Sequence, residues 1–148
     1  MHEPSTLPVM VIDDEPHLRI TASQTLELAG YTPHCFESAE QALAALPPDF
    51  PGVIVSDIRM PGMGGMELLH ELHSRDTTLP IILITGHGDI STAVEAMRAG
   101  AWDFLEKPFA GDQLLDVVRR GIEKRQLSLE NLRLKAELEV QQAALGPR

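Results

Sequence analysis

Short apolar blocks without internal alternation recur along most of the chain. They lie at residues 7–13, 52–57, 79–86 and 102–109, and a weaker, half-polar block lies at 32–38. Apolar runs of this length suit strands that are covered on both faces, as in a parallel sheet. The pattern therefore predicts five strands.

The segments between these blocks have the periodicity of amphipathic helices. Pro16 begins the first one and Gly30 ends it, as a first-turn proline and a terminal glycine commonly do. Ser38 and Gln41 have capping-box spacing at the start of the second. The predicted helices cover residues 16–29, 39–46, 66–72, 90–99 and a long final segment, 111–145.

This alternation predicts the fold class. Strands that alternate with helices imply right-handed crossovers, and we expect an α/β, doubly wound, five-stranded parallel sheet with an extended C-terminal helix. Ligands of such sheets bind beyond the carboxyl ends of the strands, which in the flavodoxin-like order means between strands one and three. The first strand ends in Asp13 and Asp14, and the third ends in Asp57. Negative charge is therefore expected at the edge where this fold accepts a ligand.

Composition narrows the function classes. The chain has 148 residues, enough for one domain with an appendage, and a formal net charge of −10. An acidic balance argues against nucleic-acid binding by this segment, because phosphates are bound by clustered Lys and Arg. The single cysteine, Cys35, fits a reducing compartment, and we expect it to be buried as a small apolar residue. No leader pattern and no membrane-spanning run occur, so the expected location is the cytoplasm.

The three carboxylates at the predicted edge repel one another unless a cation offsets their charge. An all-oxygen set of donors favours a hard cation, Mg²⁺ above all. Lys107 follows the fifth strand and Thr85 ends the fourth, so both side chains can reach the same edge. Carboxylates, Mg²⁺, a lysine and a hydroxyl suit a phosphoryl group, and Asp57, which stands alone on its strand, is the better candidate acceptor.

Four segments together resemble the receiver domain of bacterial two-component response regulators. They are DDE at 13–15, SDIRMPGMGGMELL at 56–69, ILITGHGD at 82–89 and GAWDFLEKPF at 100–109. The resemblance covers residues 7–125 and implies the strand order 2-1-3-4-5, which matches the topology argued above. It also implies a signalling phosphoacceptor rather than an enzyme that turns over a metabolite.

The resemblance further implies the roles of the acidic residues. Asp57 would accept phosphate from a phosphohistidine of a sensor histidine kinase. Asp14 and Asp57 would ligate Mg²⁺ directly, together with the backbone carbonyl of Arg59. Asp13 would act on the metal through water.

The resemblance also implies a switch. Lys107 would pair with the phosphoryl oxygens, and the bond between Lys107 and Pro108 would be cis. Thr85 would bond the phosphoryl group, and Phe104 would move inward, repacking the face formed by the fourth helix, the fifth strand and the fifth helix. Many relatives have tyrosine here, so the inward state of Phe104 would be held by packing alone. We expect this face, the linker helix, or both to form a homodimer.

Residues 126–148 are interpreted as a linker helix that follows the receiver domain. With Leu127 and Leu134 at d positions, Asn131 and Leu138 occupy a positions, which predicts a short, weak coiled-coil seam. The segment resembles the signalling helix that joins receivers to AAA+ ATPase domains in nitrogen-regulator-type activators, which act with the alternative sigma factor, sigma-54. No GxxxxGKS or GxxxxGKT motif occurs, so we interpret the chain as the regulatory part of a longer protein, without its AAA+ and DNA-binding domains.

Other functions stay open on the sequence alone. A haloacid-dehalogenase-like phosphatase also uses an aspartate and Mg²⁺, but it expects DxD after the first strand, where this chain has DD. A flavodoxin-like flavin carrier expects a phosphate loop rich in Gly, Ser and Thr after Ile12, which is missing. A third alternative is a stand-alone receiver that acts through protein contacts, including a degenerate one that needs no phosphate. For the tail, the alternative to a dimer is a single solvated helix.

Overall fold

The computed structural model of the chain describes residues 7–145 and contains one five-stranded sheet. Every pair of neighbouring strands is parallel, and the strand order is β2-β1-β3-β4-β5. The predicted α/β fold, its strand order and its parallel sheet are therefore confirmed. The strands are β1 Pro8–Ile12, β2 Thr32–Phe36, β3 Val53–Asp57, β4 Ile81–Thr85 and β5 Asp103–Glu106.

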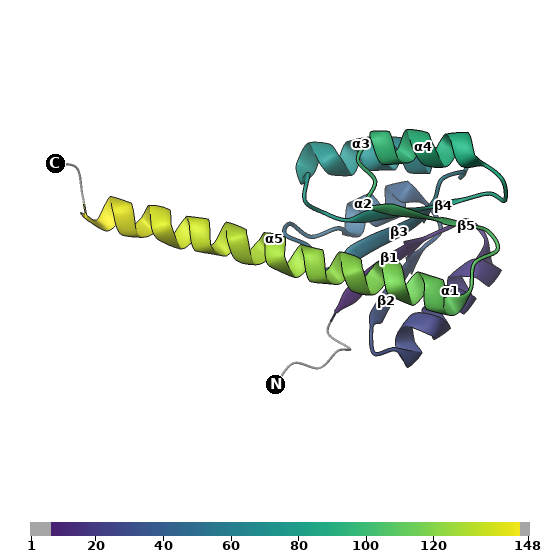
Figure 1. The fold of residues 1–148 in the computed structure, drawn as a ribbon, viewed down its shortest axis with the longest axis horizontal. Coiled ribbons are helices and arrows are strands. Elements are labelled where there is room, and N and C mark those ends of the chain that lie inside the picture. The colour runs from purple at the N-terminus through teal and green to yellow at the C-terminus, as the bar shows by residue number, and fades with distance from the viewer. Residues whose placement is uncertain (1–6, 146–148) are drawn as a thin grey trace.

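Five helices cover the two faces of the sheet, and the last one extends far beyond it (Figure 1). α1 and α5 lie on one face, and α2, α3 and α4 lie on the other. The helices are α1 Pro16–Leu28, α2 Ala39–Ala45, α3 Gly65–Arg75, α4 Ile90–Arg98 and α5 Gly111–Leu145. Among the described helices, none is both long enough and apolar enough to span a membrane.

Two apolar layers enclose the sheet. They explain why some strand blocks of the sequence are entirely apolar, whereas another is half-polar. Every residue of β3 and β4 is buried, because each strand has neighbours on both sides and helices on both faces. Leu69 of α3 is at the centre of one layer, and Leu26 of α1 and Val118 of α5 belong to the other. Each such leucine contributes about 2 kcal/mol through burial.

The edge strand β2 corrects one prediction. Cys35 was expected to be buried, and it is exposed. β2 is one of the two edge strands, and none of its residues is fully buried, because a side chain on it lacks the cover that a second neighbouring strand provides. The half-polar sequence of this block reflects that position.

The long helix α5 contacts the sheet closely over its first half and then leaves it. At Gly121 an added Cβ would lie 3.0 Å from Val53 Cγ1 and 3.4 Å from Trp102 Nε1, so a larger residue would have to push these two side chains aside. The Nε1 atom of Trp102 is buried and has no hydrogen-bond partner in the described part of the chain. The helix crosses residues 125 and 126, the predicted domain boundary, without a break. Residues 146–148 of the predicted linker lie outside the described residues.

Candidate functional site

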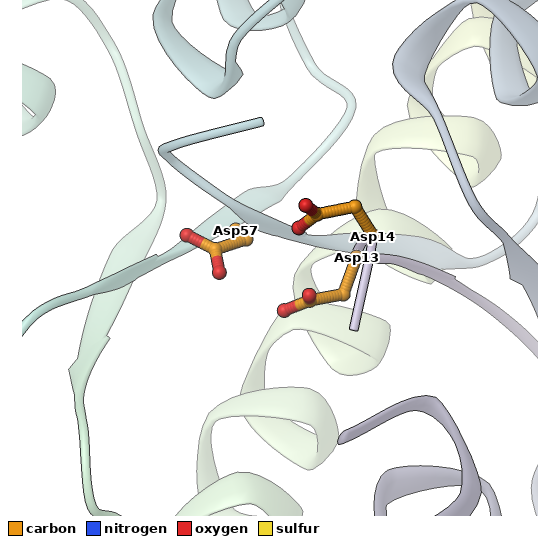
Figure 2. Close-up of side chains that lie close together, drawn as sticks. All are labelled: Asp13, Asp14 and Asp57. Carbon is orange, nitrogen blue, oxygen red and sulfur yellow. The ribbon is translucent and has the colours of Figure 1, made fainter. Parts of the chain in front are cut away.

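Three carboxylates from two adjacent strands lie together at the carboxyl edge of the sheet. Ile12 of β1 is opposite Ser56 of β3, so the residues that follow, Asp13 and Asp57, are side by side. One ligand atom from each of Asp13, Asp14 and Asp57 lies within 4.8 Å of the others. Figure 2 shows the carboxylates of Asp13 and Asp14 extending toward Asp57. The predicted convergence of these three residues is therefore present.

The surroundings of Asp13 disfavour its negative charge. Its side chain is buried, Oδ1 accepts a hydrogen bond from the backbone N–H of Glu15 at 2.8 Å, and Oδ2 has no partner among the described residues. Burial, followed by repulsion from Asp57, raises the pKa of Asp13 to about 7, although the N–H of Glu15 acts in the opposite direction. A bound cation would relieve both the repulsion and the unpaired oxygen, so these all-oxygen donors fit a hard ion such as Mg²⁺.

Lys107 supplies the positive charge of the site. Its Nζ lies 2.7 Å from Oδ2 of Asp57, and the Asp57 side chain, like that of Asp13, is buried. Burial would lower the pKa of Lys107, but the hydrogen bond with Asp57 and the charges of Asp57 and Asp13 outweigh it, and the pKa lies above its usual value. The bond between Lys107 and Pro108 is cis, as the family resemblance implied. This ammonium is in place to meet further negative charge on Asp57.

The loop after β3 holds the second oxygen of Asp57. The backbone N–H of Arg59 donates to Oδ1 of Asp57 at 3.0 Å. The Arg59 side chain is 79% exposed and forms an ion pair with Asp89 at 3.0 Å, so only its backbone belongs to the site. The proposed role of its carbonyl as a metal ligand stays a prediction.

Thr85 and Phe104 lie on the β4 and β5 side of the site. Asp57 is opposite Ile84 in the sheet, which places Thr85 one residue beyond it. Thr85 is buried, and its Oγ1 donates a long hydrogen bond of 3.5 Å to the carbonyl of Leu105. Phe104 is 38% exposed, and together with Thr85 it lines an apolar hollow of about 450 Å³ against α4. The structure therefore has Phe104 partly outside, with space beside it.

Two hydrogen bonds near the site could not be predicted from the local sequence pattern. Arg19 Nη1 donates to the carbonyl of Asp13 at 2.6 Å, and so ties the start of α1 to the end of β1. Glu106 Oε2 accepts from the backbone N–H of Gly88 at 2.5 Å, and so ties the loop after β4 to β5. An arginine in the first turns of a helix and a glutamate at a strand end are usually solvated, which is why sequence reasoning missed both.

The fold and the site together define the class of the protein: a flavodoxin-like α/β protein with an acidic, cation-compatible site and a lysine where strand order reverses. The chain belongs to the response regulator receiver domain family, whose model matches residues 9–119.

Two similar proteins are named as transcriptional regulatory proteins. The chain is 58% identical over 130 residues to the C4-dicarboxylate transport transcriptional regulatory protein DctD of Pseudomonas aeruginosa. It is 52% identical over 131 residues to the protein of the same name from Rhizobium meliloti. Both alignments cover 88% of this chain and 28% of the relative, so the chain spans less than a third of their length.

The solved structure of the response regulator StyR has the same architecture. It superimposes with a TM-score of 0.89 at 36% identity, and the match covers 95% of this chain and 71% of that chain. At this coverage the likeness includes most of the long helix α5 as well as the sheet.

Proposed function

We propose that the chain is a phosphoacceptor receiver in which Asp57 takes a phosphoryl group from a phosphohistidine of a sensor histidine kinase. The observation that carries the proposal is the convergence of three carboxylates with Lys107, whose ammonium contacts Asp57 at 2.7 Å. The new bond joins an Asp57 carboxylate oxygen to phosphorus. The bond from phosphorus to the imidazole nitrogen breaks, and the nitrogen keeps the electron pair. The result is a covalent signal rather than the turnover of a metabolite.

We propose that Mg²⁺ is held by Asp14, Asp57 and the backbone carbonyl of Arg59, with Asp13 acting through a bound water. When bound, the ion supplies positive charge that offsets the carboxylates and the incoming phosphoryl oxygens. Asp13 suits an indirect role because its Oδ2, which has no partner among the described residues, can accept a hydrogen bond from such a water. Lys107 contributes the one side-chain cation that contacts Asp57 in the described part of the chain.

The switch proposal rests on Thr85 and Phe104. A phosphoryl group on Asp57 adds negative charge and acceptor oxygens, and the Thr85 hydroxyl can turn to meet them because its present hydrogen bond is long. Phe104 would then enter the hollow that both residues line, which changes the surface of α4, β5 and α5. The change biases a two-state surface away from the phosphorylated residue.

The output of this switch is proposed by analogy with the relatives. Both C4-dicarboxylate regulators are named as transcriptional regulatory proteins and are more than three times as long as the region they share with this chain. We propose that the α4-β5-α5 surface and the exposed part of α5 form a homodimer. This homodimer would control an attached AAA+ domain that activates sigma-54-dependent transcription.

The test is chemical labelling of the whole chain. Incubation with acetyl phosphate and Mg²⁺ should add a single acid-labile phosphate, and the substitution Asp57→Asn should abolish it. Asp116→Asn, which removes an exposed carboxylate of α5, should label like the parent. Equal labelling of Asp57→Asn would contradict the proposal, and steady turnover of phosphate monoesters would favour the phosphatase alternative.

A further inference from the structure

Arg125 is a fully buried charged residue of the long helix α5. Its side chain is 0% exposed. It occupies the last position of the buried stripe of α5, after Leu114, Val118 and Ile122, and successive positions of this stripe lie four, four and three residues apart. From residue 126 to residue 144 the helix has no buried residue. Arg125 therefore marks the place where α5 leaves the sheet.

Each nitrogen group of the Arg125 guanidinium has its own acceptor. Nε donates to the carbonyl of Phe50 at 2.7 Å, Nη1 to Oγ1 of Thr78 at 2.7 Å, and Nη2 to Oδ2 of Asp76 at 2.8 Å. Phe50 precedes β3, whereas Asp76 and Thr78 lie between α3 and β4. The guanidinium thus joins α5 to two separate loops at the amino ends of the central strands.

The acceptors are themselves held in place. The backbone N–H and the hydroxyl of Thr78 both donate to Oδ1 of Asp76, at 3.0 and 2.7 Å, and the N–H of Asp76 donates to the carbonyl of Leu72 at the end of α3. Burial would raise the pKa of Asp76, but hydrogen bonds from Arg125 and Thr78 outweigh it and the pKa lies below its usual value. Asp76 therefore favours its charged form beside the guanidinium, and Thr78 orients the carboxylate through its other oxygen, Oδ1.

We propose that Arg125 fixes the direction in which the tail of α5 leaves the receiver, so that sheet and tail form one rigid body. An apolar side chain could fill the same space, but it would let the helix roll or slide. A planar guanidinium with three directional hydrogen bonds prevents both movements of the helix. Figure 1 shows how much of α5 projects past the sheet, so a small rotation at residue 125 moves the far end of the helix a long way.

This proposal is independent of the phosphorylation proposal, because the anchor and the carboxylates lie at opposite ends of the strands. Phe50 and Thr78 come before β3 and β4, and Asp57 and Thr85 end those strands. Loss of labelling at Asp57 would leave the anchor untouched, and loss of the anchor would leave the donors at Asp57 in place.

The test is single-molecule energy transfer at picomolar concentration, where a second copy of the chain does not contribute. One dye is attached to the natural, exposed Cys35 and the other to a cysteine introduced as Glu139→Cys in the exposed tail. The parent should give a single narrow peak of transfer efficiency. Arg125→Met should shift or broaden this peak, because the helix loses its three directional bonds.

A matched control separates the anchor from the helicity of the tail. Arg133→Met removes an exposed arginine of the same helix, which pairs with Glu130 and Glu137, and should leave the peak unchanged. A folded Arg125→Met chain with the parent's peak would overturn the proposal. Should circular dichroism show that Arg125→Met does not fold, Thr78→Val decides in the same way. It keeps the ion pair of Arg125 with Asp76 and removes the two hydrogen bonds of the Thr78 hydroxyl, one accepted from Arg125 and one donated to Asp76.

Discussion

Gly65 shows how little space separates α3 from the strand that carries Asp57. A Cβ at this position would lie 2.6 Å from Ile58 Cα and 2.8 Å from the carbonyl oxygen of Asp57. Both are backbone atoms, which cannot move aside as a flexible side chain would. The N–H of Gly65 also donates to the carbonyl of Ile58 at 2.9 Å, so α3 begins directly against the candidate site.

Gly65→Ala should therefore destabilise the protein by about 1–3 kcal/mol, the usual cost of overpacking. The matched control is Gly86→Ala, because an added Cβ there meets no atom within 4 Å. Its free energy of unfolding should change by less than about 0.5 kcal/mol. Urea denaturation of both variants checks the prediction, and equal stabilities would show that α3 yields at this contact.

Asp76 makes the free energy of unfolding depend on pH, and its contribution decreases toward low pH. Its pKa in the folded chain lies below the usual 3.8, so the folded state releases this proton more readily than the unfolded chain does. The contribution of Asp76 is thus fully present above the unfolded pKa, and it is lost as the pH falls through the lower folded pKa.

Asp76→Asn should reduce the free energy of unfolding near neutral pH by about 3 kcal/mol, because it leaves the buried Arg125 without a counter-charge. The gap between parent and variant should stay constant down to about pH 5 and narrow below about pH 4. Urea titrations at several pH values provide the measurement. If the difference in free energy of unfolding between parent and variant instead grew as the pH fell, the pKa of Asp76 would not be lowered by folding, and the prediction would be wrong.

At the scale of elements, the tail of α5 exposes apolar side chains that no other part of the described chain covers. Leu134, at a predicted d position, and Leu132, outside the seam, are both 47% exposed. Exposure alone therefore does not distinguish the two leucines, whereas the heptad pattern predicts that only Leu134 lies in the seam. These two leucines make a matched pair for testing the proposed dimer.

Leu134→Glu should weaken self-association by more than about tenfold, the factor that corresponds to 1.4 kcal/mol, because a carboxylate would be buried in the seam. Leu132→Glu should associate like the parent. Sedimentation equilibrium measures both dissociation constants. Equal effects of the two substitutions would contradict the proposed coiled-coil seam. A truncated chain for comparison should keep Arg125 and end after Leu129, since an earlier end would also remove the anchor.

The same scale shows what sequence reasoning could and could not predict. The blocks that became β3 and β4, and the positions of Asp57 and Lys107, followed from local patterns and from the rule that parallel strands end at one edge. The anchor did not, because the partners of Arg125 lie 47 to 75 positions away in two loops. An arginine after an apolar stripe is typical of the solvated end of a helix.

Cys35 illustrates the other kind of failure. Its residue type favours burial, but its strand is at the edge of the sheet, and exposure there depends on strand order rather than on local composition. Tertiary position overrode residue preference. The roles of Thr85 and Phe104 need a second state of the molecule, which neither a sequence pattern nor a single structure contains.

For the whole molecule, the sheet separates an acidic end from an anchoring end. The two ends are a strand's length apart, about 17 Å for five residues. At the acidic end, repulsion between the carboxylates of Asp13 and Asp57 lowers the stability of the fold. Asp13 is buried there, and its Oδ2 has no hydrogen-bond donor among the described residues. Any ion bound there acts on the stability of the entire domain.

Mg²⁺ should therefore raise the melting temperature of the whole chain, by several degrees when its concentration is about 100 times its dissociation constant. Asp13→Asn should melt higher than the parent without Mg²⁺, because the repulsion is gone, and should gain less from the ion. Glu139→Gln, which removes one exposed charge from the tail, should behave like the parent. Differential scanning calorimetry with and without Mg²⁺ checks this, and a Mg²⁺-independent parent would contradict the cation site.

The indole of Trp102 lies beside Gly121, where α5 packs closely against the sheet. It is the single tryptophan of the chain. When the protein is excited at wavelengths that tyrosine does not absorb, its emission therefore comes from one location, between β5 and the helix that carries the tail. Lifting α5 by even a small amount would admit solvent to that ring and redden its spectrum, so the movement can be followed in real time without any attached label.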